Sequence, residues 1–129
     1  MLSLNARGLR NTKKVTQLLF WLSKHGGDRG VTFLQETHTD SDIESKWRSL
    51  TKGEFIMSHG SENSRGVAFH IGKELEYKTL AKLCDSDGRY ILLLMSIQSE
   101  VFLLINSYVP NNESDQVIYF KNAHQKTQW

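Results

Sequence analysis

Residues Val31-Thr32-Phe33-Leu34-Gln35-Glu36-Thr37-His38 decide how the rest of the chain is interpreted. The run begins with apolar, β-branched and aromatic residues, a composition typical of a strand buried on both faces. Four polar residues then follow without interruption. A carboxylate at the end of a buried strand needs a compensating partner. Glu36 is therefore expected to hold a hard cation such as Mg2+, or else to cap a helix or join a salt bridge.

The composition places few limits on function. The 129 residues suffice for one domain or part of one, and 39% hydrophobic with 23% charged residues is ordinary for a folded protein. A net charge of +2 gives no general signature of nucleic-acid binding, although a local basic patch can still bind it. The single cysteine, Cys84, allows no internal disulfide. We expect no signal peptide and no membrane span, because no apolar run is long enough.

Hydrophobic periodicity predicts a mixture of helices and strands. Helices are expected over residues 12–25, 40–50 and 114–124. The second of them carries Ser41 and Glu44 at the spacing of a capping box. Strands are expected over residues 2–5, 31–36, 54–58, 67–71, 76–83, 89–97 and 101–108. A crossover at the start and a hairpin near residue 99 together indicate an α+β or layered α/β fold.

Several predicted strands end in polar residues. Asn5 ends the first strand, Glu36 follows the second, and Asn106-Ser107-Tyr108 ends the last one shortly before Asn111. An apolar strand face that becomes polar near its end suggests a strand that emerges into a cleft. We therefore expect Asn5, Glu36, Tyr108 and Asn111 to converge at one rim of a sheet. The alternative is that each is a local cap or turn residue.

The aromatic and imidazole side chains have simpler interpretations. Trp21 and Trp47 lie on predicted helices and are expected to pack against the protein rather than to stack on bases. The histidines His25, His59 and His70 show no metal-ligand spacing with one another, so we expect them at the surface or in the core.

Five short motifs occur in an order that resembles a known family. They are Ser3-Leu4-Asn5-x-x-Gly8-Leu9, Leu34-Gln35-Glu36-Thr37-His38, Gly66-Val67-Ala68, Gly88-Arg89-Tyr90 and Asn106-x-Tyr108-x-Pro110-Asn111. Together they resemble the exonuclease–endonuclease–phosphatase family, which includes DNase I and the apurinic endonucleases. The Gly-Arg-Tyr and Gln-Glu-Thr-His elements look most like the endonuclease domain of LINE-type, non-LTR retrotransposons. The resemblance covers residues 2 to about 120.

The resemblance implies a DNase I-like α+β fold, a layered β-sandwich flanked by helices, that nicks DNA by hydrolysing phosphodiester bonds with Mg2+ or Mn2+. Carried over by position, Glu36 would hold the metal, Asn5 would orient the metal shell, and Tyr108 would lie by the scissile phosphate. Asn111 would line the DNA cleft. Arg7 flanks the Asn5 turn and would contact phosphate. A fixed cation with aimed donors stabilises the negative charge that develops during cleavage.

The chain departs from the family after the Tyr108 motif. The family uses further residues there: an Asp and an Asn close together, another Asp, and a late His with an acidic partner. These are absent before Trp129, and His124 follows Tyr108 too closely. The resemblance therefore implies that residues 1–129 are the N-terminal part of one endonuclease domain. We expect this chain alone to be inactive, to lack much of its second sheet, and to aggregate through uncovered apolar strands.

The implied partners are DNA, a C-terminal half of the domain and a reverse transcriptase domain in the same polyprotein, working in the nucleus. The sequence leaves two alternatives open. One is a phosphatase of the same fold, and the other is a non-catalytic, degenerate retroelement remnant.

Overall fold

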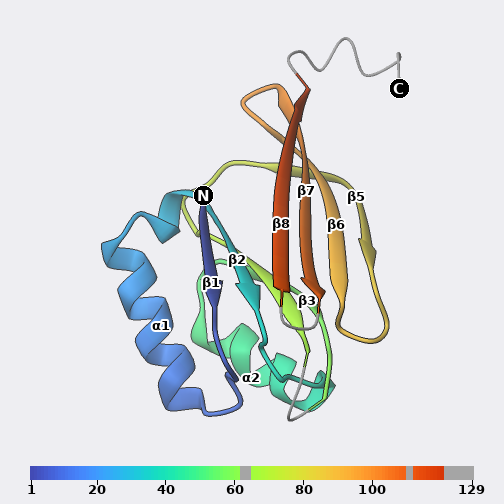
Figure 1. Cartoon of the computed structure of the whole chain (residues 1–129). Helices are drawn as coiled ribbons and strands as arrows, with labels where there is room; N and C mark the ends of the chain where they lie inside the picture. Colours follow the sequence, from blue (N-terminus) through green and yellow to red (C-terminus); the bar gives the residue numbers. More distant parts are fainter. Residues whose placement is uncertain (62–64, 110–111, 121–129) are drawn as a thin grey trace.

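Two stacked β-sheets with helices on one side form the chain (Figure 1). The structure, a computed structural model, describes residues 1–61, 65–109 and 112–120. Its helices are α1 (Thr12–Lys24), the short 3-10 helix η1 (Gly27–Arg29) and α2 (Ser41–Leu50). Its strands are β1 (Leu2–Asn5), β2 (Val31–Gln35), β3 (Glu54–Ser58), β4 (Val67–Ile71), β5 (Lys78–Cys84), β6 (Tyr90–Ile97), β7 (Glu100–Val109) and β8 (Asn112–Phe120).

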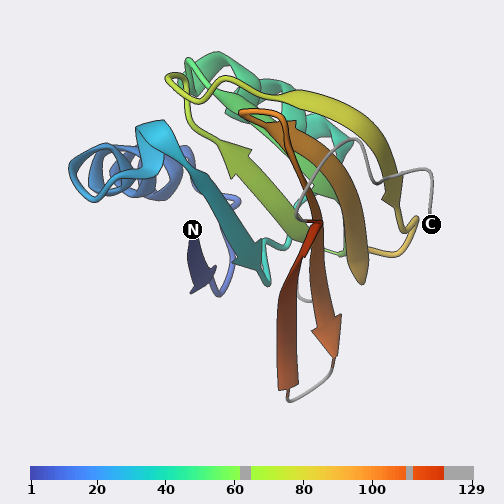
Figure 2. The same ribbon diagram turned by 90° about the horizontal axis from the view of Figure 1, so that it is seen from above.

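The first sheet has the strand order β1-β2-β4-β3, and the second has the order β5-β6-β7-β8. β1 and β2 run parallel through the crossover helix α1, with Asn5 opposite Gln35, and the other pairs are antiparallel. Seen from above, the helices, the first sheet and the second sheet form successive layers (Figure 2). The predicted α+β sandwich is confirmed. Residues 78–120 form four strands of the second sheet, and the expectation that the chain lacks much of that sheet stays a prediction.

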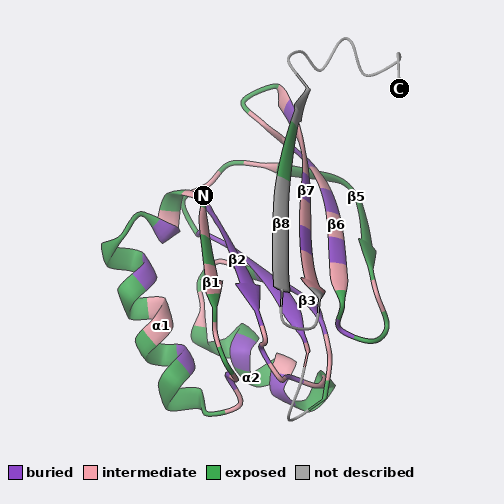
Figure 3. Ribbon diagram, in the orientation of Figure 1, coloured by how far each residue is buried: buried purple, intermediate pink, exposed green. Residues whose placement is uncertain are grey.

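β2 is buried along its whole length, as its composition predicts (Figure 3). Phe33 faces the second sheet, and its ring lies 4.8 Å, between centroids, from the ring of its neighbour Phe69 on β4 of the same sheet. Leu34, the next residue, faces the helices and joins a cluster that includes the fully buried Trp47 and Phe55. Alternate residues of one strand therefore belong to two separate cores, which explains why β2 has no polar face.

Local capping fixes where the helices begin. The Asn11 side chain accepts a hydrogen bond from the Lys13 amide at 2.8 Å and caps α1. α2 begins one residue earlier than its predicted cap implies, because Asp40 rather than Ser41 accepts from the Ile43 amide, at 3.0 Å. Neither helix of the described residues is long and apolar enough to cross a membrane.

The second sheet confirms one prediction and corrects another. β6 and β7 form the predicted hairpin, and its two turn residues, Gln98 and Ser99, have φ of +52° and +66° as a type I′ turn requires. The predicted helix 114–124 is wrong over residues 114–120, which pair with β7 as strand β8. The run 117–120, Val-Ile-Tyr-Phe, has strong β propensity, and the edge of β7 supplies hydrogen-bond partners that a helix would not use.

Candidate functional site

The turn after β1 lies directly against the segment that follows β2. The Gly8 amide donates to the Glu36 carbonyl at 2.7 Å, and the Leu9 amide donates to the Thr37 carbonyl at 2.8 Å. These bonds continue the parallel pairing of β1 and β2 beyond the ends of both strands. The first two motifs of the sequence are therefore held together by their backbones.

The remaining three motifs join the same edge through further backbone hydrogen bonds. The Thr37 amide donates to the Gly66 carbonyl at 3.0 Å, and the Gly66 amide donates to the Gly88 carbonyl at 2.9 Å. The Tyr108 amide donates to the Arg89 carbonyl at 2.6 Å. β1, β2 and β7 all end on this side of the molecule, at the bottom of Figure 1. The described ends of these strands therefore lie at one edge, whereas the convergence of the Asn5, Glu36 and Tyr108 side chains stays a prediction.

The backbone at this edge is unusually rich in left-handed conformations. Four non-glycine residues have φ between +52° and +61° there, namely Arg7, Glu36, His38 and Arg65. Such conformations are uncommon outside glycine and cost of order 1–2 kcal/mol each. Gly66, with φ of +90°, lies so close to Thr37 that a Cβ atom would overlap the Thr37 hydroxyl. A cluster of strained residues is a recognised feature of functional sites, where the geometry of side chains matters more than local stability.

The predicted site residues are placed as follows. Asn5, exposed at the end of β1, accepts a hydrogen bond from the Arg7 amide at 3.1 Å through its Oδ1 atom. Arg7 is exposed and Glu36 is partly exposed immediately after β2. Tyr108 is half-buried and packs against the core between the sheets rather than against the helices. Asn111 lies outside the described residues.

The donor set at this edge suits a hard divalent cation. The Glu36 carboxylate and the Asn5 amide are oxygen donors, and Mg2+ typically takes one or two carboxylates, several waters and a substrate phosphate. Over the described residues, no group of three or more His, Cys, Asp or Glu side chains is arranged to hold a metal.

No family model matches the chain. Over 120 residues, 93% of the chain, it is 28% identical to a Xenopus laevis protein named Transposon TX1 uncharacterized 149 kDa protein. The chain resembles a transposon protein. The matched segment is 9% of the length of that relative.

The residue after Glu36 begins a hydrogen-bond relay that ends on α2. The Thr37 hydroxyl lies 3.0 Å from the Thr39 hydroxyl, which lies 3.1 Å from Nδ1 of His59. Nε2 of His59 then lies 2.7 Å from a carboxylate oxygen of Glu44. The spacing of Ser41 and Glu44 predicted only a capping box, and the relay could not be predicted because the fold brings its members together without any local sequence pattern.

The charged end of the relay is anchored by an ion pair. Arg48 lies 2.8 Å from the second carboxylate oxygen of Glu44. Desolvation of Glu44 raises its pKa, but the hydrogen bonds from Arg48 and His59 outweigh it and hold the pKa below its ordinary value. The carboxylate is therefore ionised at neutral pH and orients the His59 ring. That ring in turn holds the Thr39 hydroxyl next to the segment that follows Glu36.

Replacing Thr39 with Val tests whether the relay stabilises the site segment. Val is nearly isosteric but leaves Thr37 and His59 without their shared hydroxyl, so we expect Thr39→Val to lower the free energy of unfolding by about 2 kcal/mol. Thr79→Val, on the exposed strand β5, is the matched control and should change it by less than about 0.5 kcal/mol. Denaturant unfolding of the three proteins measures both. Equal stability of Thr39→Val and the control would show that the relay does not contribute to the free energy of unfolding.

A second buried contact, also missed from sequence, links the two sheets behind the site. Gln35 donates from Nε2 to Oδ1 of Asn106 at 3.0 Å, and Nδ2 of Asn106 donates to the backbone carbonyls of Leu34 at 3.2 Å and Ala68 at 2.9 Å. Gln35 and Asn106 are 2% and 0% exposed. The polar residue before Glu36 is therefore structural, and it fixes β7 against β2.

Proposed function

We propose that the chain is part of a metal-dependent DNA endonuclease domain of a transposon protein. The observation that carries the proposal is the edge at which five separate segments meet through backbone hydrogen bonds, bringing the ends of β1, β2 and β7 together. The similarity to a transposon protein supports a role in handling DNA. The proposed partners are DNA and, in the same polyprotein, further endonuclease residues and a reverse transcriptase. The nick would prime reverse transcription at the target site in the nucleus.

Each residue of the edge has a proposed part in phosphodiester hydrolysis. Glu36 holds Mg2+ or Mn2+, and Asn5 orients the metal shell beside it. A bound divalent ion neutralises the charge that develops on phosphate oxygens. The Tyr108 hydroxyl donates a hydrogen bond to a non-bridging oxygen of the scissile phosphate. Arg7 contacts a neighbouring phosphate from the exposed turn after β1.

The left-handed backbone at Glu36 supports its role as a ligand. A side chain on a residue with φ of +52° leaves the chain in a direction that a strand continuing normally would not allow. The strain is held in place by the Gly8–Glu36 hydrogen bond and by the two bonds of Thr37 to its neighbours. A carboxylate held on rigid backbone is what a cation with strict geometry needs.

The first test is metal affinity. Glu36→Gln keeps the shape of the side chain but removes its charge, so we expect Mn2+ to bind about tenfold or more weakly, as loss of one carboxylate ligand predicts. Glu76→Gln, an exposed carboxylate in the connection before β5, is the matched control and should bind as the unaltered chain does. Isothermal titration calorimetry with Mn2+ measures all three proteins. Equal affinity of Glu36→Gln and the unaltered chain would exclude Glu36 as a ligand.

A short DNA duplex extends this test to the substrate. Because phosphate oxygens would complete the metal shell, the duplex should strengthen Mn2+ binding by the unaltered chain and have little effect on Glu36→Gln. Inorganic phosphate in place of DNA separates the endonuclease from a phosphatase of the same fold. Strengthening by phosphate alone, without strengthening by DNA, would contradict the DNA assignment.

A further inference from the structure

Two large aromatic side chains lie exposed on α1. Phe20 is 65% exposed and Trp21 is 41% exposed, whereas Trp47 on α2 is 0% exposed. The expectation that both tryptophans pack against the protein is confirmed for Trp47, whereas Trp21 is only partly covered, by the His25 ring on one face. Tryptophan is highly buried on average, so an exposed one on a regular helix suggests contact with another molecule.

Both aromatic rings are accompanied by basic or imidazole side chains. The His25 ring stacks on Trp21 with 4.0 Å between ring centroids and 16° between planes, and Nδ1 of His25 lies 2.7 Å from the Trp21 carbonyl. The Lys24 ammonium lies 5.2 Å from the centre of the Phe20 ring. The indole is therefore held in one orientation before any ligand arrives, which lowers the entropy lost on binding.

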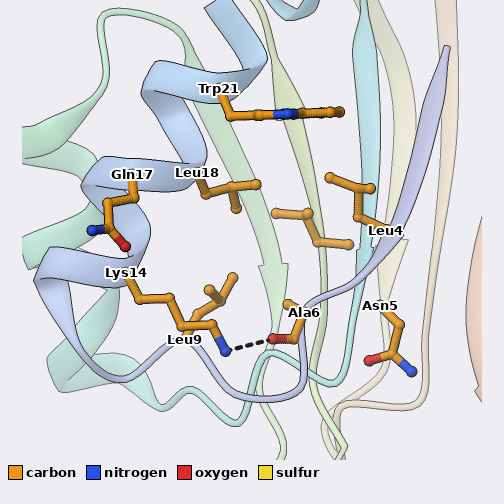
Figure 4. Close-up of a pocket in the computed structure, with 9 residues that line it drawn as sticks. Leu4, Asn5, Ala6, Leu9, Lys14, Gln17, Leu18 and Trp21 are labelled. Atoms are coloured by element: carbon orange, nitrogen blue, oxygen red, sulfur yellow. Dashed lines mark hydrogen bonds between the residues drawn. The ribbon is translucent and has the colours of Figure 1, made fainter. Parts of the chain in front are cut away.

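Trp21 also extends over a hollow between α1 and β1 (Figure 4). The hollow has a volume of about 330 Å3, and Leu4 and Leu18 lie on its apolar side. Lys14 lies at the end nearer the turn after β1, where its ammonium donates to the Ala6 carbonyl at 2.9 Å. A flat apolar group entering this hollow would meet the indole on one side and a lysine at the end.

The charge around α1 selects the class of ligand. Residues 1–27 contain five basic residues and no Asp or Glu, which leaves 11 basic and all 14 acidic residues in the rest of the chain. One of the five, Arg10, pairs with Asp40 at 2.9 Å. The net charge of the whole chain is small, but residues 1–27 form a basic segment. This segment would attract a polyanion and repel a basic partner.

We propose that the surface formed by α1 and the hollow beside β1 binds single-stranded nucleic acid, with one base stacked against Trp21 at the hollow and with Lys14 and Lys24 at neighbouring phosphates. Aromatic platforms beside basic side chains are the usual means of holding single strands, because every base has a stacking face. In a duplex those faces are already occupied, so the same surface should discriminate against double strands. The hollow adjoins the candidate metal site, because Asn5 lines it, but Trp21 and the two lysines lie on α1 and their contacts with a single strand need no metal.

Fluorescence anisotropy of a labelled oligothymidylate, with EDTA present, tests the proposal independently of the proposed endonuclease function. Trp21→Ala should raise the Kd about tenfold, since stacking of one base contributes on the order of 1–3 kcal/mol. Trp21→Phe should restore most of the affinity. The matched control, Leu80→Ala, removes an exposed apolar side chain from β5 and should leave the Kd unchanged.

The salt dependence gives a second readout. Lys24→Gln should weaken binding and reduce the slope of log Kd against log salt concentration by about one, because one phosphate contact is lost. Lys82→Gln on β5 should change neither quantity. Equal Kd values for Trp21→Ala and the unaltered chain would overturn the proposal, as would tighter binding of a duplex of the same length. Failure of the oligonucleotide to bind, with loss of self-association in Trp21→Ala, would show a protein interface instead.

Discussion

Acidification from pH 6.5 to pH 4 is expected to lower the free energy of unfolding by about 3 kcal/mol through His70 alone. Burial lowers the pKa of His70 from 6.5 to about 4, against a smaller opposing effect of Asp28. The ring is 3% exposed, lies 4.8 Å from the Phe55 ring and contacts the Thr51 hydroxyl at 2.9 Å. Its Nδ1 atom has no hydrogen-bond partner among the described residues, so a proton there would be poorly solvated.

The sign of the effect follows from which state binds the proton. Below pH 6.5 the unfolded chain protonates His70, whereas the folded chain does so only near pH 4, so stability falls as the pH falls through this window. Denaturant unfolding at several pH values measures the slope. His70→Gln should remove most of the slope of the free energy of unfolding against pH between pH 6.5 and 4. If the free energy of unfolding changed with pH equally in His70→Gln and the unaltered chain, the prediction would be wrong.

Two carboxyl groups with a lowered pKa, Asp40 and Glu44, act at lower pH than His70. The hydrogen bond from Arg10 is the largest cause that lowers the pKa of Asp40 below its ordinary value, followed by the bond from the Ile43 amide. The pKa of Glu44 is also lowered. For a carboxyl group with a lowered pKa, stability is lost as the pH falls through its folded-state pKa, which lies below the ordinary range of carboxyl groups. The His70 window therefore lies above these steps.

The parts of the fold that could be predicted from sequence are those set by neighbouring residues. The crossover β1-α1-β2 follows from an apolar stripe that includes Val15 and Leu22, between two strands. The hairpin follows from the spacing around Gln98. The convergence of strand ends was predictable because parallel strands joined by a crossover must end at the same side of a sheet.

The predictions that were wrong or missing concern contacts between residues that are distant in the sequence. β8 pairs with β7, whereas the helix expected over residues 114–124 took no account of the open edge of β7. Gln35 was interpreted only as the polar end of a strand, although its partner Asn106 lies 71 residues away. Trp21 has the same helical context as Trp47, and only the fold decides that Trp47 is fully buried while Trp21 stays partly exposed over the hollow.

Asn106→Leu is expected to lower the free energy of unfolding by about 3 kcal/mol or more. Asn106 makes all its described hydrogen bonds in a site with no exposure, and the substitution would leave two backbone carbonyls and the Gln35 amide without this partner. Because Gln35 precedes Glu36, the loss should also loosen the candidate ligand. We expect Mn2+ affinity to fall in Asn106→Leu even under conditions where the protein stays folded.

A double-mutant cycle separates the Gln35–Asn106 bond from the loss of packing. Gln35→Leu alone leaves Oδ1 of Asn106 buried without a donor, whereas Gln35→Leu with Asn106→Leu replaces both polar groups by apolar ones. The double variant should therefore be more stable than the sum of the single effects predicts, by about 1–3 kcal/mol. Ser96→Ala, a partly exposed position on β6, controls for loss of a polar group in the same sheet. Strict additivity in urea unfolding would mean that the two amides do not act as a unit, and that the sheets are held together by their apolar core alone.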